Sequence, residues 1–346
     1  MQFFDRFFQN IIDTFLIVID PNQRIFVLYL VSSVVITYVI YKSAKARLSS
    51  TEDRFLGFLF PKHVWSHPSA WLDLRYFFFH RIFGKFLLLG LSAWAMSLAF
   101  SWASGGLHIT QADTQSTLST GADILVTLGF MMIAVFVSDF LGWFCHYLQH
   151  KSPILWQFHK VHHSAEVMHP VSNYREHPID NFLYLLVTGA GIGIVFGLAV
   201  RYLGYLPNRP TLLGVPLMVF LFNIVGYNLR HSHVWLRWPG KLSMIFPSPA
   251  HHHVHHSCHP DHLDKNFAFM FPIWDVIFRT YEMPDDNRDV KFGIGDGNAD
   301  ELTSCTRLYW VPFRDAFRVF DAQRKGVRFN MSKPQPVAKE RKETGG

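Results

Sequence analysis

The residues best suited to chemistry in this chain are its histidines, because they gather in one part of the sequence. Of the 20 histidines, 16 fall between His146 and His262. Three groups have helical spacing: His146 and His150; His159, His162 and His163; His252, His255 and His256. Residues three or four apart share one face of a helix, so each group presents its rings together. Neutral imidazole is the commonest metal ligand, and eight converging rings can hold two first-row metal ions without a carboxylate.

The remaining histidines carry a weaker signal. A lone HxxxH pair is more often structural than metal-binding, but here the HxxHH pattern occurs twice beside such a pair. His251 lies four residues before His255, so its role stays open between ligand and structural residue. The others are expected to be structural or to support the site. His253 neighbours the third group but points off its face, and no spacing that matches the three groups is found for His169, His233, His259 and His262.

Acidic and thiol side chains near the histidines are further candidates. Asp139 precedes His146 by two helical turns, roughly 10 Å, and an acid inside an apolar span is by default a functional candidate. We expect it to orient an imidazole or a water, the alternative being a structural acid bonded to Ser or Trp. Glu166, Glu176 and Asp180 can orient rings or form solvated ion pairs. The three cysteines form no CxxC pair and are predicted to be reduced thiols: Cys145, Cys258 and Cys305.

Long apolar runs must position these groups. They are Ile25–Tyr41, Phe86–Trp102, Ile124–Phe144, Phe182–Val200 and Leu212–Leu229, and Asp139 is their only charged residue. Each approaches the ~20 residues that a membrane-spanning helix needs. The sequence therefore predicts an all-α polytopic membrane protein with about four or five hydrophobic helices and a cytoplasmic histidine-rich helical cap. The last two runs are expected to form a hairpin that either spans the membrane or only re-enters it.

The charges between these runs predict which side of the membrane each loop occupies, since Lys and Arg near helix ends stay cytoplasmic. The loop Lys42–Arg81 is rich in both, whereas Ala103–Gly121 contains neither. This places the N-terminus outside and the histidine groups and C-terminus inside. A bacterial inner membrane is favoured over the endoplasmic reticulum, because no retrieval signal ends the chain. The net charge of +6 reflects this bias, and no base-stacking module or basic stripe suggests nucleic-acid binding.

Five segments are expected along the chain. Residues 1–24 form an interfacial amphipathic helix, and residues 25–129 contain transmembrane helices and the basic cytoplasmic loop. Residues 130–290 form the histidine-rich catalytic core with its membrane hairpin. Residues 291–330 are a cytoplasmic segment with a helix over Leu308–Phe320, and residues 331–346 are a disordered basic tail.

The three histidine boxes, in the order HxxxH, HxxHH and HxxHH, resemble those of the fatty acid hydroxylase and sterol desaturase superfamily of integral-membrane di-iron enzymes. The run FHKVHHSAEVMHPVSNYREHP resembles the second box, SPAHHHVHHS the third, and DKNFAF followed by WDVIFRT the closing segment. The resemblance covers roughly Phe130–Tyr281. Two features depart from the family pattern: the first box, HYLQH, lacks the common Arg, and Ala268 and Arg279 stand where the family often has Gly. No subfamily is therefore assigned.

The resemblance also implies a set of ligands. Besides the eight histidines of the boxes, His231 matches the family's isolated histidine, and His177 is a candidate tenth ligand. Asp139, Asn266 and Asp275 match residues that support the ligands. No acid or base is implied beyond the di-iron centre itself.

The number of histidines suggests the chemistry. Nine ligands exceed the three of a typical catalytic zinc site, so two metals are the simpler interpretation. At a lipid boundary, two irons with O2 suit oxidation of an unactivated C–H bond. We expect hydroxylation of a membrane lipid, such as a sterol or fatty acyl lipid. A desaturase with the same centre and a non-catalytic metal-binding membrane protein are the alternatives.

Electrons must come from outside the chain. O2 activation consumes two electrons per turnover, and the sequence contains no flavin, haem or dinucleotide-binding motif. The resemblance implies cytochrome b5 or a ferredoxin-type protein as the donor, docking on the basic cytoplasmic face. The lipid, the oxidised carbon and the oligomeric state stay open.

Overall fold

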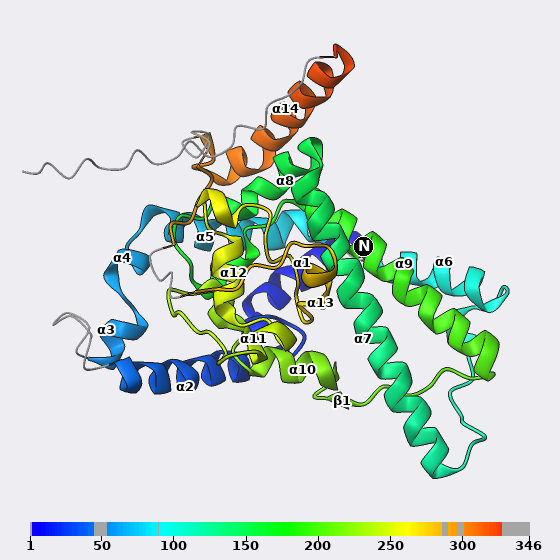
Figure 1. Ribbon diagram of the computed structural model, residues 1–346. Helices are drawn as coiled ribbons and strands as arrows, with labels where there is room; N and C mark the ends of the chain where they lie inside the picture. Colours follow the sequence, from blue (N-terminus) through cyan, green and yellow to red (C-terminus); the bar gives the residue numbers. More distant parts are fainter. Residues whose placement is uncertain (1, 45–53, 89, 286–289, 296–300, 327–346) are drawn as a thin grey trace, which may run out of the picture.

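The computed structural model describes residues 2–44, 54–88, 90–285, 290–295 and 301–326 of the 346-residue chain. Their regular structure is almost entirely helical, which confirms the all-α prediction (Figure 1). The helices are α1 (Gln2–Phe15), α2 (Val27–Ala44), α3 (Phe55–Leu59), α4 (Lys62–Trp65), α5 (Pro68–Phe79), α6 (Leu91–Ser104), α7 (Thr120–Lys151), α8 (Pro153–His163), α9 (Pro178–Leu203), α10 (Leu217–Ile224), α11 (Leu242–Ile245), α12 (Pro249–His255), α13 (Ile273–Ile277) and α14 (Cys305–Arg324). The strands of the described residues, β1 (Thr211–Leu212) and β2 (Val215–Pro216), form one short antiparallel pair.

Four helical stretches of the described chain are long and apolar enough to cross a membrane. They are Val27–Ala44, Pro68–Ser104, Thr120–Lys151 and Pro178–Leu203. Large apolar side chains on them remain exposed, for example Trp102 at 76% and Leu125 at 72%. Lipid rather than water is the natural surrounding for such a surface. This finding confirms a polytopic membrane protein at the lower end of the predicted number of spans.

The fifth apolar run, Leu212–Leu229, does not form a spanning helix. The structure divides it into β1, β2, the short α10 and a 3-10 turn over Tyr227–His231. Gly214 and Gly226 adopt left-handed backbone conformations, with φ of 78° and 87°, and a left-handed residue ends a helix. Of the two predicted forms of the hairpin, the one with a second spanning helix is therefore not found, and the re-entrant form stays a prediction. This run instead carries the chain from the end of α9 back to the histidines.

Helices α6 and α9 pack in parallel through a row of glycines on α9 (Figure 1). A Cβ atom placed on Gly189, Gly193 or Gly197 would lie 2.6, 2.2 and 2.6 Å from the carbonyl oxygens of Ser92, Met96 and Phe100. Only glycine permits so close an approach of two backbones, and small residues four apart are typical of helix contacts within membranes. These three glycines therefore fix the distance and register of the two helices.

The two predicted amphipathic helices are present as α1 and α14. In α1, Phe4, Phe8 and Phe15 are exposed, while Asn10 is buried and donates to the backbone oxygen of Arg81. The apolar face of α1 thus points away from the protein, as an interfacial helix requires. Helix α14 begins before and ends after the predicted helix Leu308–Phe320, and it packs against α8.

Two further predictions concern the cysteines and the C-terminal tail. All three cysteines are free thiols, as predicted, and the predicted tail at 331–346 lies outside the described residues.

The N-terminal end of α2 lies beside the histidine region. Arg24, just before α2, forms an ion pair of 2.6 Å with Glu176, and its carbonyl oxygen accepts from Asn228. The far end of α2 is tied to the same region, since Tyr41 contacts Phe58 and the Phe58 carbonyl oxygen bonds His233. This packing argues against the sequence-based topology, in which α2 separates an external N-terminus from internal histidines, although α2 is long and apolar enough to cross a membrane. The side of the N-terminus therefore stays a prediction. Loop charge does not reveal whether an apolar helix crosses the membrane or lies along the protein.

Candidate metal centre

Four chain segments deliver the nine predicted ligands to one place. Helix α7 ends at the first box, Ser152 caps α8, and α8 runs back across the end of α7 with the second box. Pro153 at the first position of α8 suits this turn, because a missing N–H costs nothing there. The 3-10 turn Tyr227–His231 supplies His231, and α12 supplies the third box.

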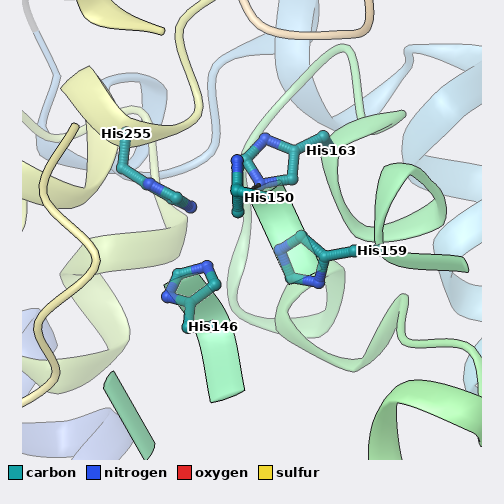
Figure 2. A group of neighbouring side chains, drawn as sticks. All are labelled: His146, His150, His159, His163 and His255. Atoms are coloured by element: carbon teal, nitrogen blue, oxygen red, sulfur yellow. Dashed lines mark hydrogen bonds between the residues drawn. The ribbon is translucent and has the colours of Figure 1, made fainter. Parts of the chain in front are cut away.

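The nine rings form two compact groups, and all nine are buried. Within each group the candidate ligand atoms lie within 4.8 Å of one another. Group A contains His146, His150, His159, His163 and His255, whose rings converge in Figure 2. Group B contains His162, His231, His252 and His256. Adjacent residues are divided between the groups: His162 and His163 of α8 belong to different groups, as do His255 and His256.

The nitrogen spacing within the groups suits a shared ion. Nε2 of His150 lies 3.1 Å from Nε2 of His163 in group A. In group B, Nε2 of His252 lies 2.8 Å from that of His231 and 3.1 Å from that of His256. Two nitrogens that bind one ion at right angles, each at ~2.1 Å, lie about 3 Å apart. The observed spacing equals that of hydrogen-bonded rings and is also compatible with neighbouring ligands on a common ion.

Several of these nitrogens have no hydrogen-bond partner among the described residues although they are buried. They are Nε2 of His146, both ring nitrogens of His159, Nε2 of His255 and Nδ1 of His256. An unpartnered polar atom in the interior costs about 1–3 kcal/mol, so such a concentration calls for a missing partner. The residues of both groups therefore fit metal ions.

The opposite ring nitrogens are held by the surrounding protein. Nδ1 of His146 lies 2.9 Å from the carbonyl oxygen of Phe267, and Nδ1 of His255 lies 2.8 Å from that of Lys265. Nδ1 of His231 lies 3.0 Å from the Ser172 hydroxyl. A ring that donates from Nδ1 keeps its Nε2 lone pair for a metal, which is the usual support of a histidine ligand.

Burial keeps these rings in the form that binds metals. Burial lowers the pKa of His162 from 6.5 to about 4. It also holds the pKa values of His163, His252 and His256 well below the usual value, with the neighbouring rings adding to the effect. The imidazoles are therefore neutral at physiological pH, and neutral imidazole is the ligand form.

One short segment, residues 265–268, orients rings from two boxes. The Asp275 carboxylate accepts from the backbone N–H groups of Phe267 and Ala268 and from the indole of Trp143. Asn266 has a left-handed backbone, with φ of 56°, and its side chain bonds the backbone of Glu282. Asp275 and Asn266 thus act through the carbonyl groups of the segment and touch no ring nitrogen.

Asp139 does not orient a histidine or sit beside one, which corrects the expectation from sequence. Its carboxylate accepts from the backbone N–H groups of Met270 and Phe271 and from the indole of Trp274. These hydrogen bonds engage both carboxylate oxygens of Asp139, and among the described residues no histidine is hydrogen-bonded to Asp139. The alternative of an acid bonded to Trp is closer to the structure. Asp139 anchors the closing segment to α7.

His177 is also a correction, because it belongs to neither group. It caps α9: Nδ1 accepts from the N–H of Ile179 at 3.1 Å, and Nε2 lies 3.1 Å from the Tyr309 carbonyl oxygen. His251, whose role was open, is likewise engaged, with Ser248 at one nitrogen and Tyr281 at the other. The histidines expected to be structural lie outside both groups: His169, His233, His253, His259 and His262.

Two acids approach the groups in ways the sequence left open. Asp180 is buried, and its carboxylate lies 3.5 Å from Nδ1 of His159. Glu176 is paired with Arg24; burial alone would raise its pKa, but the charges of Arg24 and Lys85 lower it to about 2. Neither acid is a solvated surface group. Glu166, in contrast, is half exposed and lies 3.8 Å from His67.

A polar cavity of about 80 Å³ touches both groups. Its wall includes His146 and His159 of group A and His162, His231 and His252 of group B. The rest of the wall includes charged and polar side chains, namely Arg24, Glu176, Asp180, Asn181, Tyr227 and Arg230. Sequence reasoning missed Arg24 and Arg230. The only available signal for Arg230 was a charge at the end of the last apolar run, directly before His231.

Comparisons with known proteins agree with this geometry. A sequence model of the fatty acid hydroxylase family matches residues 131–280. The human alkylglycerol monooxygenase is 29% identical over 167 residues, which cover 45% of this chain and 32% of that protein. The Caenorhabditis elegans protein of the same name is 26% identical over 155 residues, 44% of this chain and 26% of that protein. The ornithine lipid hydroxylase OlsE of Rhizobium tropici is 30% identical over 169 residues, 47% of this chain and 45% of that protein.

This chain thus covers less than half the length of each of these three relatives. No solved structure matches it. The matched region contains all nine grouped histidines together with Asp139, Asn266 and Asp275. The histidine-rich region of this chain, residues 131–280, is therefore similar to the fatty acid hydroxylase family, whose sequence model it matches.

Proposed function

We propose that this protein is an O2-dependent di-iron enzyme that hydroxylates a C–H bond of a membrane lipid. The observation that carries the proposal is the division of nine buried histidines into two groups that both face one cavity. The reaction balances as R–H plus O2, two electrons and two protons, giving R–OH and water. Group A would hold one iron and group B the other, and bound iron would supply the activation of O2.

The chain's own residues position and protect the reacting groups. Segment 265–268 fixes the rings of His146 and His255, and Ser172 fixes that of His231. Burial of the site excludes bulk water, which would limit wasteful reactions of oxygen. Because the cavity borders both histidine groups, a lipid carbon placed in it would face both of them.

Two electrons per turnover would come from a separate carrier of the cytochrome b5 or ferredoxin type. The loops that flank the histidine region are rich in Lys and Arg, while residues 103–121 between α6 and α7 contain neither. This bias supports a cytoplasmic histidine region, and such a basic face would attract an acidic carrier. The relatives, a monooxygenase and a hydroxylase by name, favour hydroxylation over desaturation by the same centre.

Histidine variants on one helix test this function. Wild-type protein should contain two irons per chain and, with a reductant and carrier, add one oxygen to a lipid of the host membrane. His255→Ala should reduce the iron content and abolish the product. His253→Ala is the matched control, because His253 lies on α12 outside both groups, near the Leu229 carbonyl oxygen. Iron analysis and lipid mass spectrometry are the measurements. Full iron content and product with His255→Ala would refute the proposal, and a product lighter by two hydrogens would indicate a desaturase.

A further inference from the structure

A second, apolar pocket adjoins the polar cavity. It has a volume of about 430 Å³, within the range of about 300–1,000 Å³ that is typical of small-molecule sites. Its wall comes from α10, α11, the start of α12 and residues 270–271. Tyr227 and Arg230 line both spaces, so these two side chains form the boundary between them. The two cavities differ sharply in chemistry although they share this wall.

Arg230 at this boundary is a buried cation without an acidic partner. It is 5% exposed and forms no ion pair within the described part of the chain. Its guanidinium donates to the carbonyl oxygens of Ala268 and Phe269 and lies 3.3 Å from Nδ1 of His252, while its Nε–H is buried with no partner among the described residues. Arg24 in the same cavity, by contrast, is paired with Glu176. A buried charge and an unused donor are costly unless a ligand supplies the acceptor.

The outer side of the apolar pocket carries exposed apolar side chains. Leu221 and Val225 of the α10 side are 45% and 53% exposed, and Leu242 and Phe246 of the α11 side are 41% and 47% exposed. All four line the pocket. An apolar opening of this kind admits a hydrocarbon chain from surrounding lipid and gives no reason for a polar molecule to enter from water.

We propose that one lipid molecule occupies both spaces, with its hydrocarbon chain in the apolar pocket and an oxygen-bearing polar group beside Arg230 in the polar cavity. The chain enters sideways from the lipid past α10 and α11. The polar group accepts a hydrogen bond from the free Nε–H of Arg230. This assignment builds on the proposed lipid hydroxylation and names the part of the lipid that reaches the histidines.

The position of the oxidised carbon follows from this arrangement. The apolar pocket does not include any histidine of the two groups in its wall, whereas the polar cavity includes five of them. The carbon that faces both groups is therefore close to the polar end of the lipid, and the far end of the chain stays remote from them. The polar cavity holds only a small group, so the enzyme selects against large substituents next to that carbon.

Photo-crosslinking tests the chain site without any turnover. The probe is a long-chain monoalkyl glycerol lipid with a diazirine near the end of its chain, added to the full-length iron-loaded protein in membranes without oxygen or reductant. Labels should concentrate on the pocket residues of α10 and α11. Leu242→Trp fills the pocket and should lower this labelling about tenfold, since excluding about two methylenes costs this much affinity. Ile245→Trp is the matched control, because Ile245 is 58% exposed on the same helix and does not line the pocket.

Two comparisons test the polar end. A hydrocarbon probe with the same diazirine but no oxygen should label the pocket more weakly than the glycerol lipid. Arg230→Gln, checked for retained iron, should remove most of this difference. Equal labelling by the two probes, or unchanged labelling in Leu242→Trp, would overturn the assignment. If the protein labels as expected but never oxidises a lipid, the proposed function fails and the binding site stands. An oxygen found far along the chain of a product would contradict the placement of the polar end.

Discussion

At the scale of single residues, the histidines depend on side chains that do not touch a metal. Asp275 is the clearest example, because it accepts from two backbone N–H groups of the segment that orients His146 and His255. Its effect therefore passes through the backbone to two rings of group A. Mutation of such a supporting residue commonly lowers metal affinity by roughly 10- to 100-fold, although the residue does not contact the ion.

Asp275→Ala should lower the iron affinity of the protein by roughly 10- to 100-fold. It should also lower the free energy of unfolding by about 1–3 kcal/mol for each buried N–H group that is left without a partner. Iron titration and thermal unfolding in detergent measure the two effects. The control is Asp261→Ala, whose side chain is 88% exposed. An Asp275→Ala protein with wild-type iron affinity would show that segment 265–268 holds its shape without the carboxylate.

Buried neutral histidines also predict how stability depends on pH. Burial lowers the pKa of His162, His233 and His253 from 6.5 to about 4. Between these values the unfolded chain binds more protons than the folded one, so the free energy of unfolding rises with pH. Iron-free protein should be most stable above pH 6.5 and lose stability as the pH falls towards about 4. Chemical unfolding at a series of pH values measures this, and a flat profile across the window would contradict it.

At the scale of elements, the packing of α6 on α9 depends on glycine. A Cβ atom on Gly193 would lie 2.2 Å from the carbonyl oxygen of Met96, and a backbone atom cannot move aside as a flexible side chain can. Gly193→Ala should therefore separate the two helices locally and cost about 1–3 kcal/mol. Gly129→Ala on α7 is the control, since nothing lies within 4 Å of its added Cβ. Unfolding in detergent should show a loss for the first variant only.

The elements that were predicted well are those whose residues show a periodic pattern. Spacing of three and four residues placed His146 with His150, and His252 with His256, and all nine predicted ligands lie in the two groups. The roles of Asp139 and His177 could not be predicted from the sequence, because each depends on a partner far along the chain, Trp274 for Asp139 and Tyr309 for His177.

The apolar run Leu212–Leu229 has the hydropathy of a membrane-spanning helix, but hydropathy carries no information about backbone conformation. The left-handed Gly226 that interrupts it is visible only in three dimensions. The glycine row of α9 does have a sequence signal, since Gly189, Gly193 and Gly197 are small residues four apart.

At the scale of the whole molecule, the helices predict which segments share a side of the membrane. Helices α6 and α9 run in parallel away from the histidines, and α7 runs back towards them. The far ends meet: the N–H of Leu206 donates to the carbonyl oxygen of Asp113 at 2.7 Å. Arg24 lies in the polar cavity at the opposite end. We expect the N-terminus and the histidine region to share one side, and residues 105–119 to lie on the other.

Epitope tags test this topology. Tags at the N-terminus and in the exposed turn at residues 259–261 should be protected together or cleaved together when sealed vesicles are treated with protease. A tag between residues 114 and 118 should behave oppositely. An N-terminal tag that behaves like the one at 114–118 would show that α2 crosses the membrane.

The division of neighbouring histidines between the groups has a consequence for how the protein fills with metal. His162 and His163 belong to opposite groups, as do His255 and His256. The first ion to bind would order both α8 and α12, so the second ion would bind with a smaller loss of conformational entropy. Uptake should then be cooperative: apo and fully loaded chains should dominate a metal titration followed by native mass spectrometry, and singly loaded chains should be scarce.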